Sequence, residues 1–87
     1  MHVMVELSLY PLVNEYISPI QDFIDRLNGY ADITVSTSST STQVTGQYEV
    51  VMKILGDEMQ RTHQVVGQAI FVAKFLNFDA MQARKSS

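Results

Sequence analysis

The chain has 87 residues, a formal net charge of −3 and no cysteine, so we expect one small domain without disulfides, thiolate metal sites or cysteine nucleophiles. Its six lysine and arginine residues are scattered, and a nucleic acid partner, which requires a basic face, is therefore not expected. A hydrophobic content of 46% with 17% charged residues is typical of a packed domain rather than a disordered chain.

Residues 2–10 alternate between two sets of side chains, and a period of two predicts a half-buried strand. One set is apolar and should face the core: Val3, Val5, Leu7 and Leu9. The other set includes Met4, Glu6, Ser8 and Tyr10. Pro11 cannot donate a ladder hydrogen bond and should end the strand.

A helical period follows, with apolar residues at spacings of three and four: Ile17, Ile20, Ile24 and Leu27. The stretch from Ser18 to Gln21 resembles a capping box with Pro19 at the first helical position. A start near Asn14 is the alternative, but it would place Pro19 inside the helix and kink it. The pair Asn28-Gly29 predicts the helix end.

Residues 33–45 consist almost entirely of β-branched residues and serine, and they predict strands at about 32–38 and 41–46 joined by a Ser/Thr turn. The alternative is a flexible polar linker. From Gln47 to Thr62 the helical period returns in two apolar stripes. We expect a second, smaller stripe of Val50 and Ile54 to touch a partner. The first stripe should face the core and consists of Tyr48, Val51, Met52, Leu55 and Met59. Gly56 inside this helix predicts close packing.

The last predicted strand spans about 68–78, and both of its alternating sets are largely apolar, so both faces should be covered. Which set faces the helices stays open. We expect one domain over 1–79 and a disordered tail over 80–87. The order strand, helix, strand, strand, helix, strand predicts an α+β, ferredoxin-like βαββαβ fold, with a four-stranded antiparallel sheet and two helices on one face. A second subunit or a ligand should cover the other face.

Catalytic patterns are missing from the sequence. There is neither a glycine-rich phosphate loop nor a nucleophile elbow, and His2 and His63 have no zinc-ligand spacing. The carboxylates of the two helices, including Asp57 and Glu58, are expected to be solvated surface charges. Acylphosphatases share the topology, but their phosphate-cradling loop is replaced here by Pro11–Asn14. We therefore expect no enzymatic activity and no cofactor.

Three segments of the sequence resemble segments of a known protein family. Residues 5–12, VELSLYPL, resemble the opening strand of the YkoF-like thiamine-binding proteins, and Ser41–Gly46 followed by Tyr48–Val51 is similar to their third strand and second helix. The resemblance covers roughly residues 3–78. It implies non-covalent binding of thiamine or its hydroxymethylpyrimidine moiety, and, for a chain with one repeat, a homodimer or homotetramer.

Seven residues are candidates for the ligand site. The resemblance implies Ser41 and Thr42, since the Ser-Thr pair of the family's third strand lies near the bound pyrimidine. The alternation of side chains adds five residues whose hydroxyls and carboxylate suit a heteroaromatic ligand: Ser8, Tyr10, Ser36, Ser38 and Glu6. Tyr10 or Phe71 would stack on the ring, and Glu6 would offset a positive charge. Solvated strand faces also carry such residues, which is the alternative explanation.

Three hypotheses follow for the function. The first is a thiamine- or hydroxymethylpyrimidine-binding homo-oligomer, the second is a structural or regulatory interaction module without a ligand, and the least favoured third is a hydrolase of the acylphosphatase type. Because no apolar run approaches the roughly 18 residues of a membrane span and no signal peptide pattern precedes the first strand, we expect a cytoplasmic protein without a membrane partner.

Overall fold

Six elements follow the predicted order in the computed structural model, which describes residues 1–77. They are β1 (His2–Pro11), α1 (Ile17–Asn28), β2 (Thr34–Thr37), β3 (Thr42–Gln47), α2 (Tyr48–Val66) and β4 (Ala69–Leu76). The end of the predicted domain at residue 79 and the predicted disordered tail over 80–87 lie outside the described residues.

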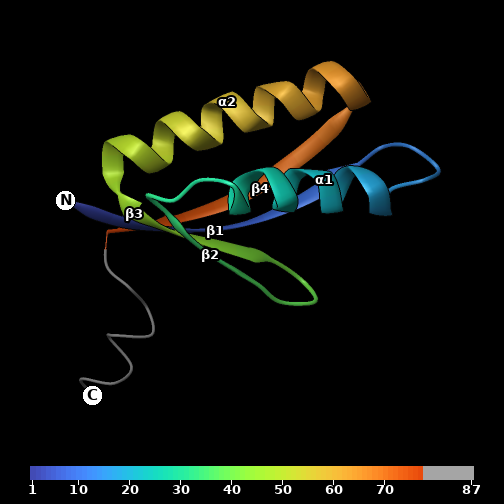
Figure 1. The fold of residues 1–87 in the computed structure, drawn as a ribbon. Helices are drawn as coiled ribbons and strands as arrows, with labels where there is room; N and C mark the ends of the chain where they lie inside the picture. Colours follow the sequence, from blue (N-terminus) through green and yellow to red (C-terminus); the bar gives the residue numbers. More distant parts are fainter. Residues whose placement is uncertain (78–87) are drawn as a thin grey trace.

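The four strands form one antiparallel sheet in the order β2-β3-β1-β4, and both helices cover the same face (Figure 1). This is the ferredoxin-like α+β fold, and the prediction is confirmed. The core lies between the helices and the sheet, where apolar side chains from every layer are buried: Val3, Val5, Leu7, Leu9, Phe23, Leu27, Ile33, Val44, Val51, Ile54 and Leu55. We call the other side of the sheet the open face.

The first strand continues one residue beyond the predicted end, through Pro11, which pairs with Ala69 of β4. The N–H of the next residue, Leu12, donates to the Gln68 carbonyl at 3.0 Å, on the β4 side. Backbone groups of successive strand residues point to opposite sides, so the N–H that Pro11 lacks would point away from β4. At that point β1 has no strand partner on the other side, and proline therefore costs no ladder bond.

Helix α1 begins at Ile17 rather than at Pro19, and the predicted capping box is wrong. Ser18 already lies inside the helix, and the carboxylate of Glu15 accepts hydrogen bonds from the N–H groups of Ile17 and Ser18 at 3.1 and 3.3 Å. Pro19 is tolerated because the first N–H groups of a helix have no intrahelical partner. The hydrogen bonds from Ser18 and Ile17 outweigh slight desolvation and lower the pKa of the Glu15 carboxyl.

The second helix is longer than predicted, and its buried side differs from the expected one. Ile54 is buried in the core while Met52 is partly exposed, so the second apolar stripe is not a free contact surface as expected. The prediction of close packing at Gly56 is wrong, since an added Cβ there would meet no atom within 4 Å. Glu58, expected to be solvated, is only 2% exposed.

The register of β4 against β1 decides which of its two apolar sets faces the helices. Phe71 pairs with the core residue Leu9, while Val72 pairs with Ser8 on the open face. Ile70 and Val72 are 49% and 54% exposed, so the chain by itself leaves this face of the strand uncovered, and its covering by a second subunit or a ligand stays a prediction. Within residues 1–77, no helix combines the length and apolar character needed to cross a membrane.

Candidate functional site

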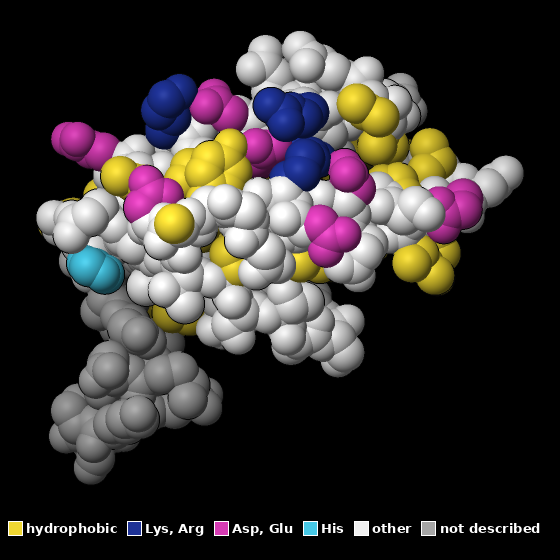
Figure 2. All heavy atoms as spheres, in the orientation of Figure 1, with side chains coloured by type: hydrophobic (Ala, Val, Ile, Leu, Met, Phe, Trp, Pro, Cys, Tyr) yellow, Lys and Arg dark blue, Asp and Glu magenta, His cyan; other side chains and the backbone are white. Residues whose placement is uncertain are grey.

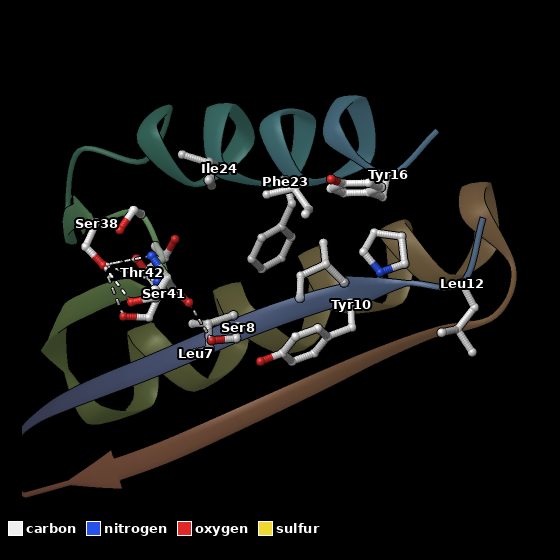
Figure 3. A pocket seen from close by; sticks show the side chains of 15 residues that line it. Leu7, Ser8, Tyr10, Leu12, Tyr16, Phe23, Ile24, Ser38, Ser41 and Thr42 are labelled. Atoms are coloured by element: carbon white, nitrogen blue, oxygen red, sulfur yellow. Dashed lines mark hydrogen bonds between the residues drawn. The ribbon is translucent and has the colours of Figure 1, made fainter. Parts of the chain in front are cut away.

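A cavity lies where β1 extends beyond its neighbour β3. The pairing of β1 with β3 ends at Leu7 opposite Thr42, whereas its pairing with β4 continues to Pro11. Residues 8–11 of β1 therefore have a strand on one side only. On the other side, α1 and the turn between β2 and β3 enclose a cavity of about 610 Å³ (Figure 3), which falls within the usual size range of small-molecule sites.

One wall of the cavity is apolar and the other is rich in hydroxyl groups. β1 and its continuation contribute Leu7, Ser8, Leu9, Tyr10, Pro11 and Leu12, α1 and the residue before it contribute Tyr16, Ile20, Phe23 and Ile24, and the hairpin contributes Ser38, Ser39, Thr40, Ser41 and Thr42. None of these lining residues is charged. Because a buried charge requires a partner, such a lining favours a ligand whose buried part is uncharged, with a flat apolar body and a polar edge.

Phe23 forms the fixed part of the apolar wall. It is 2% exposed, and its ring lies 5.1 Å from the ring of Phe71, tilted by 55°. The guanidinium of Arg26 lies 5.8 Å from the centre of the Phe23 ring. In Figure 3 the Phe23 side chain points from α1 toward β1, between the helix and the strand. A planar ligand that enters the cavity would therefore meet an immobilised aromatic ring.

The mouth of the cavity is unusually apolar for a surface. Tyr10 is 54% exposed, the connection between β1 and α1 exposes Leu12, Val13 and Tyr16, and α1 begins with the exposed Ile17. Figure 2 shows hydrophobic side chains gathered at the end of the molecule where this connection lies. Exposed apolar groups at one place commonly mark a binding surface.

The hydroxyl of Ser38 organises the hairpin turn. Its Oγ accepts hydrogen bonds from the N–H groups of Thr40 and Ser41 at 3.3 and 3.2 Å, and the Ser38 N–H donates to the Ser41 carbonyl at 2.9 Å. The Ser8 hydroxyl donates to the Thr40 carbonyl at 3.0 Å and thereby fastens the turn to β1. Two of the predicted ligand-binding hydroxyls are thus already used to shape the wall of the cavity.

Thr42 differs from these serines. It is 6% exposed and lines the cavity, yet no hydrogen bond joins its hydroxyl to another residue of the described 1–77. The Ser41 hydroxyl is only loosely engaged, 3.5 Å from the Ser38 Oγ. Among the described residues no fully buried side-chain oxygen lacks a partner, so the Thr42 hydroxyl is open to the cavity, where water or a ligand can satisfy it. The Thr40 hydroxyl is engaged equally loosely, at 3.5 Å from the Ser38 Oγ, so this wall can offer a ligand the hydroxyls of Ser39, Thr40, Ser41 and Thr42.

Five of the seven predicted site residues line the cavity, namely Ser8, Tyr10, Ser38, Ser41 and Thr42. The other two lie elsewhere, on the open face. Ser36 and Glu6 both pair with Gln43, and the Glu6 Oε1 lies 3.7 Å from the Lys74 Nζ. The structure therefore does not bring Ser36 and Glu6 together with the other five.

Sequence reasoning missed Leu9, Tyr16 and Phe23. Leu9 was assigned only to the core, and the two aromatic residues were left out of the apolar pattern of the first helix. Phe23 lies three residues after Ile20 and four before Leu27, so its place on the inner side of the helix could have been read from the same spacing. Nothing local to the sequence indicates that β3 ends opposite Leu7.

A polar network beside Phe23 holds α1 against α2. The Arg26 guanidinium forms an ion pair with the buried Glu58 carboxylate and donates to the Thr62 hydroxyl at 2.7 Å. The Tyr30 hydroxyl donates to the other Glu58 oxygen at 2.6 Å. Arg26 also contacts Asp22 at 3.0 Å. Through these contacts, α1 and the aromatic wall it carries keep a fixed position over the sheet.

The same contacts shift two pKa values in opposite directions. Burial pushes the pKa of Glu58 upward, but the hydrogen bonds from Tyr30 and Arg26, together with the positive charges of Arg61 and Arg26, outweigh it and hold this pKa below its ordinary value. The pKa of Tyr30 is raised, chiefly because its hydroxyl donates to the Glu58 carboxylate and also because of desolvation. At neutral pH the network therefore contains an ionised carboxylate and a neutral phenol.

Solved structures of several other proteins share this fold along their whole length. A hypothetical protein from Methanocaldococcus jannascii matches with a TM-score of 0.78 at 17% identity, over 98% of this chain and 95% of its own. A protein from Streptococcus pneumoniae matches with a TM-score of 0.75 at 18% identity, over 99% and 97% of the two chains.

A third structure carries a functional name. A protein from Thermotoga maritima, provisionally named as a thiamine biosynthesis/salvage protein, matches with a TM-score of 0.71 at 15% identity over 100% of both chains. No family model matches this chain, and no curated protein does. At these identities the likeness extends to the fold, and the chain has the ferredoxin-like architecture of these structures.

Proposed function

We propose that the protein binds thiamine or its hydroxymethylpyrimidine moiety without catalysis and works as a homo-oligomer. The observation that carries the proposal is the cavity beside β1, which combines an immobilised Phe23 ring, an uncharged lining and the partnerless hydroxyl of Thr42. An aminopyrimidine has a flat body for the ring and a polar edge for the hydroxyl. Neutral hydrogen bonds to so small a ligand suggest micromolar affinity, on the order of −8 kcal/mol.

Two likenesses support this ligand class. The sequence resembles the YkoF-like thiamine-binding proteins over residues 3–78, and a structure of the same fold and length carries a provisional name in thiamine biosynthesis and salvage. The resemblance implies a role for Ser41 and Thr42, and both residues line the cavity. We place this chain with the single-repeat members of that family.

The absence of catalysis is part of the proposal. The residues that line the cavity include no histidine, carboxylate, lysine or cysteine. General acid–base chemistry and an activated nucleophile both need such a group within hydrogen-bond reach of the reacting atom. The serines at the hairpin have no neighbouring base and would remain weak nucleophiles.

The open face of the sheet supports the homo-oligomer. Ile70, Val72 and Tyr10 lie in adjacent pairs of β4 and β1 and are each about half exposed. A second copy of the chain would remove this apolar surface from water. In this arrangement the cavity, which lies between α1 and the hairpin, stays on the side that carries the helices.

The test is a calorimetric titration of ligand-free protein with thiamine and with 4-amino-5-hydroxymethyl-2-methylpyrimidine. Saturable binding with one site per chain is expected for at least the pyrimidine. A matched pair of variants locates the site: Thr42→Val should weaken binding, while Thr45→Val, on the same strand but on the open face opposite Met4, should not. A folded protein that binds neither compound would contradict the proposal.

A second candidate function is an interaction module without a ligand. The exposed apolar residues at the mouth of the cavity and on the open face favour it. This function predicts that neither compound binds, that Thr42→Val affects only stability, and that the oligomer is still formed.

A further inference from the structure

The hydrogen-bonding directions along β1 can be followed residue by residue. The Met1 carbonyl accepts from the Tyr48 N–H at 2.8 Å, on the side of β3, and the Leu12 N–H donates to the Gln68 carbonyl at 3.0 Å, on the side of β4. Both registers run without a break from residue to residue. Backbone groups alternate between the two sides of a strand. The N–H and C=O groups of odd-numbered residues of β1 therefore point toward β3, and those of even-numbered residues point toward β4.

Leu9 is the odd-numbered residue that comes after β3 has ended. Val5 and Leu7 pair with Val44 and Thr42, but no residue of β3 or of the hairpin pairs with Leu9. Within the described part of the chain, its N–H and C=O have no hydrogen-bond partner. Both point past the end of β3 toward the cavity that Leu9 lines, and in an extended strand they lie side by side.

Buried or half-buried backbone groups are almost always paired. The next odd-numbered residue is Pro11, which has no N–H to offer. Leu9 therefore presents the one complete donor–acceptor pair of this free strand segment, in the cavity that Thr42 and Phe23 also line. The cavity thus has a specific polar edge as well as a specific apolar wall.

We propose that the backbone of Leu9 recognises the ligand, through an edge on which a hydrogen-bond acceptor and a donor are adjacent. The ligand takes the place of the β3 residue that would otherwise pair with Leu9. In an aminopyrimidine, the ring nitrogen accepts from the Leu9 N–H and the neighbouring exocyclic amine donates to the Leu9 carbonyl. This inference rests on the proposed function and names the chemical group that the site selects.

The specificity follows from the cost of leaving Leu9 unpaired. An analogue without the amine leaves the Leu9 carbonyl desolvated and without a donor, and it should bind at least tenfold more weakly. A charged group on the ring is not needed, since the contact is between neutral partners. The relevant ligand class is therefore planar nitrogen heterocycles with an amino group next to a ring nitrogen.

Amide hydrogen exchange, followed by NMR on the wild-type protein, tests the inference without a variant that risks unfolding. Without ligand, the Leu9 amide should exchange much faster than the amides of Val5 and Leu7, which pair with β3. Saturation with 4-amino-5-hydroxymethyl-2-methylpyrimidine should slow Leu9 exchange at least tenfold and leave Val5 and Leu7 unchanged. The same pyrimidine with hydrogen in place of the amine should bind at least tenfold more weakly.

The outcomes separate this inference from the proposed function. Saturable binding that leaves Leu9 exchange unchanged, or equal affinity for the analogue without the amine, would overturn the inference while the proposed function stands. A Leu9 amide that is already as protected as Leu7 in the free protein would overturn it as well. Failure of both thiamine and the pyrimidine to bind would overturn the proposed function and the inference together.

Discussion

The hydroxyl of Ser8 donates to the backbone carbonyl of Thr40 across a sequence separation of 32 residues, at 3.0 Å. This bond joins the end of β1 that has no β3 residue beside it to the hairpin turn, and it closes one side of the cavity. Because a single side-chain hydrogen bond sets the distance between two walls, its removal should affect binding more than folding.

We therefore expect Ser8→Ala to weaken pyrimidine binding while lowering the free energy of unfolding by only about 1 kcal/mol. Urea denaturation and calorimetric titration measure the two effects. Ser36→Ala is the matched control, because Ser36 is exposed on the open face opposite Gln43 and should change neither quantity. Unaltered affinity in Ser8→Ala would show that this bond does not hold the wall in place.

Thr42→Val replaces a hydroxyl by a methyl group of nearly the same size. Since the Thr42 hydroxyl has no partner among residues 1–77, the free energy of unfolding should stay the same or rise. Affinity for the pyrimidine should fall roughly fivefold, the equivalent of about 1 kcal/mol for one neutral hydrogen bond. Stability is read from urea denaturation and affinity from calorimetry, with Thr45→Val as the control. A clear loss of stability would mean that the hydroxyl has a structural role.

Acid should destabilise the protein partly through Glu58. Its pKa is lower in the folded chain than the ordinary value of 4.5 for a glutamate, so its stabilising contribution is complete above about 4.5 and is lost as the pH falls through the lower folded pKa. Denaturation curves at a series of pH values should show this loss. Tyr30→Phe removes the hydrogen bond at 2.6 Å and thereby raises the folded pKa of Glu58 toward its ordinary value, so the acid loss should become smaller and should be complete at a higher pH.

The variant Glu58→Ala leaves the partly buried Arg26 without its main partner and should cost on the order of 3 kcal/mol. Glu15 also has a lowered pKa and contributes to acid sensitivity in the same direction, so Glu15→Gln serves as the comparison that separates the helix cap from the buried network. An acid dependence that Tyr30→Phe leaves unchanged would contradict the assigned role of Tyr30.

A charged side chain introduced on the open face tests whether this face forms the contact between subunits. Val72→Glu should shift the oligomer toward monomer, because the carboxylate would be desolvated in the contact, while the fold is retained since Val72 is 54% exposed in the single chain. Val65→Glu is the control, because Val65 is exposed at the end of α2. Sedimentation velocity measures the mass. An unchanged mass in Val72→Glu, or a monomeric wild type, would contradict the proposed interface.

The order of elements was predictable because each carries its own period. The alternation over residues 2–10 and the three-and-four spacing from Ile17 to Leu27 depend on neighbours along the chain. The buried role of Glu58 was not predictable, because its partners Tyr30 and Arg26 lie 28 and 32 residues away. A carboxylate on a helix is ordinarily solvated, and only the packing of α1 on α2 reverses that expectation.

The candidate site was predicted in part for a related reason. Alternation correctly places Leu7 and Glu6 on opposite faces of β1. The cavity, however, lies at an edge of β1 and not on a face of the sheet, so Ser8 and Tyr10 line it while Glu6 does not. That edge exists because the register pairs Leu7 with Thr42. Register depends on turn geometry and long-range packing, which side-chain period alone does not contain.

The length of the β2–β3 hairpin therefore controls whether a chain of this fold has a cavity at all. Two more residues in each limb would carry β3 alongside Leu9, complete the ladder and fill the space with backbone. Such a change lies at the surface and leaves the core between helices and sheet intact. Relatives of this fold would then gain or lose a ligand through insertions and deletions in one turn, and hairpin length becomes a feature by which binding and non-binding chains can be sorted.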